Sequence, residues 1–426
     1  MQRIDRIDRI LSLTVKPFAF ILSAFSSQNY LRKSMNRNLQ QLFDIAQKPE
    51  RLAVGLMSGT SLDGLDIALC RFSGHDMSTR FDLVNFMTVP YGDDYKKDIQ
   101  QIFAKKQVDL EKLCLLNAYT GSFHAQLILD TLRQWHIERK EVDFIASHGQ
   151  TIYHAPKRLH GLPNYPNATL QIGDADHIAV KTGIITISDF RQKHIAAGGE
   201  GAPLALYGDV ILGSKQGENR ILLNIGGIAN LTWLPGNSNG AEVVCTDIGP
   251  GNTLIDAACR EFFNKAFDED SAIAFSGKVN NDLLQALLVH PFFKEAAPKT
   301  TGPELFNLEY VKQAQQTSNT THISANDLVA TLSALTAQSI NTFISNSFID
   351  VDHILLSGGG ARNPFVVNQL QQNFPDKIGN TADLGIDPDA KEAILFALLG
   401  NEALCGEPLV IGNNPAVLMG KFSFPF

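Results

Sequence analysis

The sequence has few of the residues that mark a metal-binding, redox-active or nucleic-acid-binding protein. Its 426 residues include five cysteines, an odd number, and no Cys-x-x-Cys pair. The net charge of −8 argues against a nucleic-acid surface, so any bound nucleotide is expected to be a small metabolite. Most of the cysteines lie in apolar stretches, so we expect buried free thiols in a reducing cytoplasm; they are Cys70, Cys114, Cys245, Cys259 and Cys405.

Two common catalytic signatures are also missing. There is no Gly-x-x-x-x-Gly-Lys-Ser/Thr motif, which argues against a P-loop kinase, and no Gly-x-Ser-x-Gly elbow, which argues against a serine hydrolase. The composition, 44% hydrophobic and 19% charged, is that of a soluble globular protein. Because a chain of this length exceeds one ordinary hydrophobic core, we expect two lobes.

The first 40 residues differ in composition from the rest of the chain. They contain seven Lys or Arg against two Asp. The apolar run Pro17–Phe25 is too short to span a bilayer, and no convincing cleavage site follows it, so we expect no membrane association. We expect residues 1–45 to form a disordered extension without catalytic residues, and Met35 is an alternative start of translation.

After residue 50 the hydrophobic pattern alternates between strands and helices. Three strands come first, followed by helices and single strands, which indicates a lobe with a mixed sheet. The expected strands are Leu52–Met57, Leu65–Phe72, Phe81–Val89, Asp143–Ala146, Leu170–Ile172 and Ile184–Ser188, and the expected helices are Asp93–Ala104, Leu110–Trp135 and Ala175–Lys181.

A second series begins at Arg220 and repeats the first. Its expected strands are Ile221–Ile225, Ala229–Leu234, Glu242–Asp247 and His353–Ser357, and its expected helices are Thr253–Phe263, Val279–Leu288, Ala325–Asn346 and Pro388–Leu399, the last capped by Asp387. The predicted fold class is therefore α/β, a duplicated two-lobed actin/hexokinase-like (ribonuclease H-like) fold with ATP in the cleft between lobes. We assign residues 50–215 and 385–426 to the first lobe and residues 216–384 to the second.

A turn rich in glycine and hydroxyl groups follows the first strand. Glycine lets backbone amides approach an anion, so we expect this turn to clasp the β- and γ-phosphates of ATP. Asp63 would then lie near a Mg²⁺-bound water, with Mg²⁺ held mainly by the phosphates. The alternative is an ordinary hairpin. The candidate residues are Ser58, Gly59, Thr60, Ser61, Leu62, Asp63, Gly64, Leu65 and Asp66.

Two further glycine turns support the same interpretation. The first strand of the second lobe ends in a matching turn, and a triple glycine later separates a strand from a helix. There an adenine ring can lie against the backbone while the helix N-terminus faces phosphate. A tight strand-to-helix turn without a ligand is the alternative. The candidate residues are Asn224, Gly226, Gly227 and Asn230, with Gly358, Gly359, Gly360 and Asn363.

Asp247 lies at a strand end, directly before a glycine turn that opens a helix. Open α/β sheets place reactive groups at such strand ends. A carboxylate there can accept a proton from an attacking water or hydroxyl. It can instead cap the helix that begins near Thr253, or hold magnesium.

Polar residues at other strand ends are candidates for a polyol or amino-sugar pocket. His148 can instead be a structural histidine bonded to backbone, and Asp189 and Arg191 can instead form an ion pair. The candidates are Ser147, His148, Gly149, Gln150, Asp189 and Arg191, together with Gly249, Gly251 and Asn252.

Seven motifs in this order resemble the anhydro-N-acetylmuramic acid kinase family, from residue 52 to about residue 415. No single one is decisive, but the ordered set is specific. The motifs are Gly55–Gly64, Ser147–Thr151, Asp189–Arg191, Gly201–Leu204, Asn224–Gly227, Asp247–Asn252 and Gly358–Gly360.

The resemblance implies a cytoplasmic, dimeric enzyme of cell-wall recycling that uses ATP and Mg²⁺. Such an enzyme opens the 1,6-anhydro bridge of its amino sugar with water while it phosphorylates O6. Asp247 matches the catalytic aspartate and Glu392 a glutamate that lines the site. His194 and Glu200 depart from the family pattern, and the sequence assigns them no role. Another sugar or acyl kinase of the same superfamily is the alternative function, and an ATP-dependent regulatory protein is a more distant one.

Overall fold

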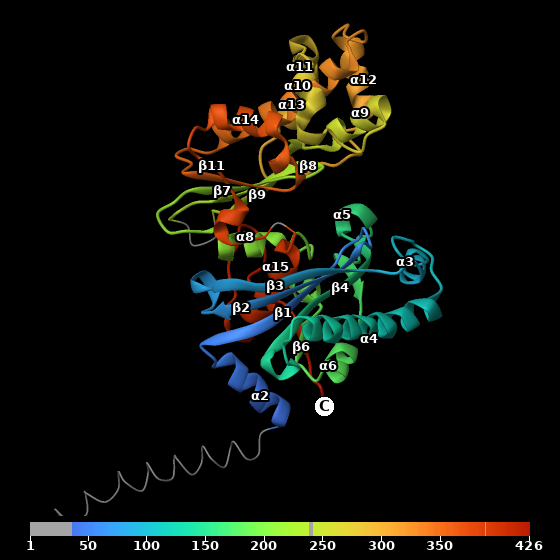
Figure 1. The fold of residues 1–426 in the computed structure, drawn as a ribbon, viewed down its shortest axis with the longest axis vertical. Coiled ribbons are helices and arrows are strands. Elements are labelled where there is room, and N and C mark those ends of the chain that lie inside the picture. The colour runs from blue at the N-terminus through green and yellow to red at the C-terminus, as the bar shows by residue number, and fades with distance from the viewer. Residues whose placement is uncertain (1–35, 238–241, 388) are drawn as a thin grey trace, which may run out of the picture.

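The computed structural model describes residues 36–237, 242–387 and 389–426. Figure 1 shows two sheets stacked along the long axis, each with its own helices. Helices α8 (Ala205–Gly213) and α15 (Lys391–Cys405) lie between the two sheets. These two helices therefore separate the first sheet from the second.

The first sheet has seven strands in the order β12-β6-β4-β1-β2-β3, with β5 paired to β4. Strand β1 pairs antiparallel with β2 and parallel with β4, and β2 pairs antiparallel with β3. The strands are β1 (Glu50–Ser58), β2 (Gly64–Ser73), β3 (Arg80–Pro90), β4 (Phe144–Ala155), β5 (Ala168–Ile172), β6 (Thr186–Ser188) and β12 (Lys421–Ser423).

The second sheet has five strands in the order β11-β10-β7-β8-β9. Its pairings repeat those of the first sheet: three antiparallel strands, then two parallel ones. This repeated order confirms the predicted duplicated α/β fold. The strands are β7 (Arg220–Ile225), β8 (Ile228–Leu234), β9 (Val244–Pro250), β10 (His353–Ser357) and β11 (Ile378–Asn380).

Capped helices cover the outer faces of the sheets. Asp109 begins α4 (Leu110–Gln134) by accepting from two backbone amides, and Ser324 begins α13 (Ala325–Ser347) by accepting from the amide of Asp327. The other helices of the first half are α3 (Asp93–Gln100), α5 (Lys157–His160), α6 (Ala175–Thr182) and α7 (Phe190–Ala196). Those of the second half are α9 (Thr253–Phe263), α10 (Ala272–Ser276), α11 (Asn281–Leu288), α12 (Leu308–Thr317) and α14 (Pro364–Asn373).

One hydrophobic cluster continues from the first sheet to the second through α8 and α15. It joins Ala53 of β1 to Leu222 of β7 by way of Val210 and Phe396. Helix α15 packs directly on β1 because Gly55 has no side chain: a Cβ there would lie 2.0 Å from the Ala393 carbonyl oxygen. The C-terminal helix is thus part of the core of the first half.

The structure corrects three sequence-based predictions. Residues 37–46 are not disordered but form α2 (Arg37–Ala46), capped by Asn36, while residues 1–35 lie outside the described part of the chain. Strand β4 runs on to Ala155, so the Ser147–Gln150 segment lies within a strand rather than after one. Helix α15 begins at Lys391, and Asp387 accepts instead from the amide of Asp389 before the helix.

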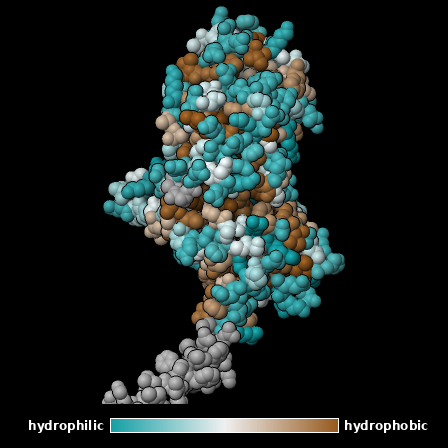
Figure 2. Space-filling model, turned by 90° about the vertical axis from the view of Figure 1, so that its left-hand side faces the viewer, coloured by the Kyte–Doolittle hydropathy of each residue, from teal (hydrophilic) through white to brown (hydrophobic). Residues whose placement is uncertain are grey.

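Over the face drawn in Figure 2, hydrophilic side chains surround small hydrophobic patches. Among the helices that the structure describes, none combines the length and the apolar character that a membrane crossing requires.

Candidate active site

The first turn connects β1 to β2 and is braced by side chains. The Ser58 hydroxyl donates to Gln150 Oε1 at 2.5 Å and lies 2.7 Å from the Tyr91 hydroxyl. Tyr91 in turn lies 2.9 Å from His124 Nε2. Both Ser58 and Gln150 are buried, and their side chains hold the turn; that Ser58 binds phosphate and Gln150 binds sugar stays a prediction.

The glycines of the first turn do not supply its positive φ. Leu62, not a glycine, has a positive φ of 60° there. Gly64 is required by packing, since a Cβ would lie 2.4 Å from the Val89 carbonyl oxygen of β3. Gly59 meets nothing closer than the Ser61 hydroxyl at 3.6 Å. Space remains beside Gly59, and Thr60 and Ser61 are partly or fully exposed there.

The second turn, between β7 and β8, is braced by backbone. The amides of Gly251 and Thr253 donate to the Gly227 carbonyl, and the amide of Asn252 donates to Gly226. The Asn252 side chain also donates to the carbonyls of Ile225 and Gly226, at 3.2 and 3.1 Å. A Cβ on Gly251 would lie 2.3 Å from the Gly226 carbonyl oxygen. Gly251 and Asn252, predicted to bind substrate, therefore hold this turn in place.

The triple glycine packs against the end of β7. Gly358 has a φ of 78°, and a Cβ there would lie 2.7 Å from Asn224 Oδ1. A Cβ on Gly360 would lie 2.2 Å from Ile225 Cγ2, whereas Gly359 meets nothing closer than 3.8 Å. Only the middle glycine therefore leaves room for a ligand against the backbone.

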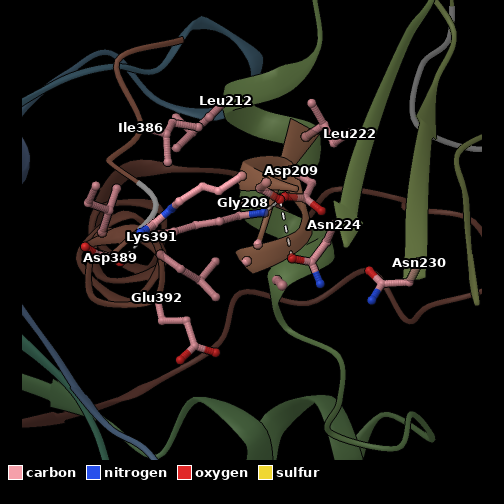
Figure 3. A pocket seen from close by; sticks show the side chains of 17 residues that line it. Gly208, Asp209, Leu212, Leu222, Asn224, Asn230, Ile386, Asp389, Lys391 and Glu392 are labelled. Atoms are coloured by element: carbon pink, nitrogen blue, oxygen red, sulfur yellow. Dashed lines mark hydrogen bonds and ion pairs between the residues drawn. The ribbon is translucent and has the colours of Figure 1, made fainter. Parts of the chain in front are cut away.

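A cavity of about 340 Å³ lies between the sheets, bounded by β7, β8, the triple glycine, α8 and the start of α15 (Figure 3). Of the predicted site residues it is lined by Asn224, Asn230, Gly358, Gly359 and Glu392. These come from both halves of the chain, as the duplicated fold requires. The lining also includes residues that the sequence argument missed, namely Asp209, Arg362, Asp389 and Lys391.

Asn363 does not line this cavity. Its Oδ1 accepts from the amide of Val366, as the cap of α14, and from the Ser271 hydroxyl at 2.7 Å. Asn363 therefore has a structural role at the start of α14, and its binding of the nucleotide stays a prediction.

Asp247 lies on β9, where it pairs in register with Asn230 of β8. Its Oδ2 accepts from the backbone amide of Thr301 at 2.8 Å. Burial raises the pKa of Asp247, the Thr301 amide lowers it, and the negative charge of Glu304 raises it. The carboxylate is thus held by one oxygen, in a setting that makes it a stronger base than an exposed aspartate.

Arg191 is fixed by two partners in the first half. Its Nε donates to His148 Nε2 at 3.0 Å, and its Nη1 donates to the Gly201 carbonyl at 2.7 Å. His148 Nδ1 lies 2.9 Å from the Gly149 carbonyl, so Nδ1 carries the proton and Nε2 accepts. Burial, followed by the charge of Arg191, lowers the pKa of His148 to about 3. His148 is therefore hydrogen-bonded to the backbone, as expected of a structural histidine, and it also orients Arg191.

Asp189 does not pair with Arg191, because its carboxylate contacts the Lys421 ammonium of β12. It borders a second cavity, of about 380 Å³, that Ser147, His148 and Gly149 also line. The predicted sugar-binding residues are thus divided between this cavity and the surroundings of Arg191. Gly249 is separate from both, since a Cβ there would lie 2.9 Å from Phe293.

Glu392 lies in the first turn of α15. Burial raises its pKa, as does the negative charge of Asp66, whereas Arg191 and Lys391 lower it. Asp66, on β2, accepts from the Thr88 hydroxyl at 2.6 Å. Burial also raises the pKa of Asp66, and Asp389 and Asp63 add to this effect. Glu392 is therefore close enough to both Asp66 and Arg191 to feel their charges.

The carboxylates of the first half do not form a ready-made metal cage. Within the described ranges, no group of three or more His, Cys, Asp or Glu is placed to hold a metal ion. Asp63 and Asp66 carry carboxylate oxygens next to the first turn. Mg²⁺ commonly takes one or two carboxylates together with substrate phosphates, so these residues fit that mode of binding.

Comparison with known sequences decides the family. The sequence model described as anhydro-N-acetylmuramic acid kinase matches residues 51–421. The chain belongs to the anhydro-N-acetylmuramic acid kinase family.

Similar relatives carry the same name. The anhydro-N-acetylmuramic acid kinase of Pseudoalteromonas atlantica is 52% identical over 400 residues, which cover 92% of this chain and 100% of the relative. That of Caldanaerobacter subterraneus is 39% identical and covers 90% of this chain and 100% of the relative. A solved ROK family glucokinase from Streptomyces griseus aligns over 81% of this chain and 98% of its own, at 10% identity and a TM-score of 0.31. Membership in the kinase family thus rests on the sequence matches.

The two departures from the pattern of this kinase family have structural roles. His194 is buried, and its Nδ1 accepts from the Gly201 amide at 2.9 Å. A Cβ on Gly199 would lie 2.1 Å from the His194 ring, so this histidine supports the loop that ends at Gly201. Glu200 pairs with Arg158 of α5 at 3.1 Å, which offsets its negative charge.

Proposed function

We propose that the protein is an ATP-dependent anhydro-N-acetylmuramic acid kinase. It opens the 1,6-anhydro ring of its sugar with water and phosphorylates O6, giving N-acetylmuramic acid 6-phosphate and ADP. Family membership supports the reaction. The mechanism rests on the position of the Asp247 carboxylate. This half-buried carboxylate is held by the Thr301 amide, beside Asn230 of the second turn.

In the proposed reaction Asp247 accepts a proton from the water whose oxygen forms a bond to C1 of the sugar. The C1–O6 bond breaks, and O6 takes the γ-phosphoryl group while ADP leaves. The proton taken by Asp247 returns to solvent. Phosphoryl transfer depends mainly on positioning and on neutralising charge, which is the proposed work of the two turns.

ATP is proposed to lie between the lobe of residues 50–215 and 385–426 and the lobe of residues 216–384. The backbone beside Gly59, Thr60 and Ser61 would face the phosphates, and Gly359 would face the adenosine. Arg191 and Glu392 would line the sugar side. Mg²⁺, when bound through the phosphates beside Asp63 and Asp66, would neutralise charge on the transferring group.

Product analysis tests the function directly. The protein is incubated with ATP, Mg²⁺ and the anhydro sugar in ¹⁸O-labelled water, and the products are identified by mass spectrometry and NMR. We expect a 6-phosphate with the label at C1. Phosphorylation of glucose or another simple hexose in place of the anhydro sugar would favour a different sugar kinase, and a product without label at C1 would reject the hydrolytic half.

We also propose that the enzyme is a cytoplasmic homodimer. The family resemblance supports the dimer, and α4 exposes the apolar side chains Leu115 and Tyr119, which are 61% and 52% exposed. Sedimentation velocity at several protein concentrations tests this; a single species of monomer mass would contradict it.

A further inference from the structure

Three polar side chains meet at the wall of the cavity between the sheets. The Lys391 ammonium lies 2.9 Å from Asp209 Oδ1, and the Thr232 hydroxyl donates to Asp209 Oδ2 at 2.9 Å. The Asp209 side chain is only 11% exposed and that of Lys391 is 26% exposed. Both oxygens of a nearly buried carboxylate are therefore engaged, one by a cation and one by a hydroxyl.

The three residues belong to three different elements that pack on one another. Thr232 is on β8 of the second sheet, and Asp209 is on α8, which lies between the sheets. Lys391 is the first residue of α15, the helix that packs on β1 of the first sheet. Their contacts therefore link the two halves of the molecule at the wall of the cleft.

The position of Lys391 is not explained by the stability of its helix. A positive charge in the first turn opposes the helix dipole, and although Glu392 in the same turn is favourable there, α15 has no side-chain cap. Removing a lysine and an aspartate from water is also unfavourable, and a well-packed apolar pair is often as stable. Because neither effect favours the Lys391–Asp209 pair, we look for its role in the candidate active site that it borders.

The residue that follows Lys391 provides this role. Consecutive residues of a helix point in directions about 100° apart, and Figure 3 shows Glu392 leaving the helix in a different direction from Lys391. Holding the ammonium on Asp209 therefore fixes the rotation of the first turn and the direction of the Glu392 carboxylate. Contact of Ala393 with Gly55 fixes the same turn against β1.

We propose that Asp209, Lys391 and Thr232 form a positioning network that orients Glu392 and joins the two lobes at the cleft. These residues act through Glu392 and through the relative placement of the lobes. The proposal rests on the proposed function, because Glu392 is taken as a residue of the sugar site. It assigns no contact with sugar or phosphate to Asp209 or Lys391.

The test compares four variants with the wild-type enzyme: Lys391→Met, Asp209→Asn, their combination, and Lys391→Arg. Lys112→Met is the matched control, since Lys112 pairs with Asp98 at 2.7 Å and is 30% exposed, but it lies on α4 away from the cavity. For each variant we measure kcat, the KM values for ATP and sugar, the Tm, and hydrogen exchange of peptides that cover residues 391–396.

A misplaced catalytic group commonly costs up to about 100-fold in rate, so we expect Lys391→Met and Asp209→Asn each to lower kcat by at least about 10-fold. Both KM values should change by less than about threefold, since binding contacts remain. The double variant should lose no more than the worse single variant, because both remove the same interaction. Lys391→Arg should recover most of kcat, and exchange in residues 391–396 should accelerate in Lys391→Met but not in Lys112→Met.

Several results would overturn the network. One is an unchanged kcat in Lys391→Met, and another is a kcat in the double variant that falls by the product of the two single losses. A third is a rise in the KM for ATP at constant kcat in Lys391→Met, which would make Lys391 a nucleotide ligand. Wild-type activity reports separately on the proposed function. If the wild type were inactive on the anhydro sugar, the exchange experiment would still decide whether Lys391 holds the first turn of α15.

Discussion

The two sheets place different chemical groups at equivalent positions. Next to the first turn, Asp66 of β2 pairs with Met57 of β1 and Thr88 of β3. Next to the second turn, Asn230 of β8 pairs with Asn224 of β7 and Asp247 of β9. The carboxylate thus lies on the middle strand in one half and on the outer antiparallel strand in the other. Duplication supplies the scaffold, while the residues beside each turn distinguish the two halves.

The turns themselves are also held differently. A chain of side chains, from Gln150 through Ser58 and Tyr91 to His124, supports the first. The second is held by backbone bonds from the Gly251–Thr253 segment. The first turn should therefore be sensitive to changes in buried polar groups, and the second to any added atom at its close backbone contact.

The largest effect is expected from exchanging the carboxylate beside each turn for an amide. Asp247→Asn should lower kcat by at least about 100-fold, the usual contribution of a general base, with ATP binding retained. Asp66→Asn is the matched variant of the first sheet and should mainly raise the KM for MgATP, by about tenfold. Steady-state kinetics with calorimetric ATP titration measures both. Equal losses of kcat in the two variants would show that the halves do not differ as proposed.

A smaller effect should separate the glycines of the two turns. Gly251→Ala places a Cβ 2.3 Å from a backbone oxygen, which cannot move aside, so the free energy of unfolding should fall by about 1–3 kcal/mol. Gly59→Ala meets nothing within 3.5 Å and should change it by less than about 0.5 kcal/mol. Urea unfolding of both variants tests this. A Gly251→Ala protein as stable as the wild type would mean that the second turn is not held by close backbone contact.

The first half should also be the one that responds to acid. Burial lowers the pKa of His124 to about 3. His124 is the last residue in the chain of hydrogen bonds that supports the first turn. An unfolded histidine titrates near 6.5, so between pH 6.5 and 3 the unfolded chain binds the extra proton. This contribution to stability is present above pH 6.5 and is lost as the pH falls, by about 1.4 kcal/mol per pH unit.

Urea unfolding at pH 7, 6 and 5 measures the slope. His148, whose pKa is also about 3, should add a similar contribution to the pH dependence of the free energy of unfolding. The variant His124→Gln should be less stable at pH 7 but should show a shallower decline. Identical slopes for this variant and the wild type would indicate that His124 is protonated in the folded protein.

The smallest of these effects concerns one hydroxyl in the first turn's support. Tyr91→Phe removes the partner of both the Ser58 hydroxyl and His124 Nε2 but leaves the bond between Ser58 and Gln150. Loss of these two buried hydrogen bonds should cost about 1–2 kcal/mol in the free energy of unfolding, with kcat changed by less than about threefold. Tyr95→Phe, which removes a longer bond of 3.2 Å to Thr120, is the control and should cost less. A large loss of kcat in Tyr91→Phe alone would give its hydroxyl a catalytic role.

Much of the fold could be predicted because its signals are local. Strand periodicity and the glycines after Ser58 and Ile225 placed both turns at the ends of their strands. Helix boundaries were less secure: Pro388 suggested a start that the structure places at Lys391. The basic composition of the first 40 residues obscured α2, although Asn36, its cap, was a readable signal.

The site was harder to predict because its polar partners are distant in sequence. Ser58 and Gln150 are 92 residues apart, and no local pattern shows that their side chains bond to each other. The motifs singled out both residues but did not show that they contact each other. Lys391 had a weak signal, a lysine in the first turn of a helix, but its partner Asp209 lies in a different helix and could be identified only in three dimensions.

The packing of α15 on β1 has a consequence for the order of folding during synthesis. The second sheet draws on residues 220–380, a continuous segment, whereas the first sheet needs both its N-terminal strands and the chain after residue 390. Chain segments fold as they leave the ribosome. The second half can therefore form while the first still lacks its last helix and β12. A chain that stops before residue 390 should lose the half made first, although every residue of its opening strands is present.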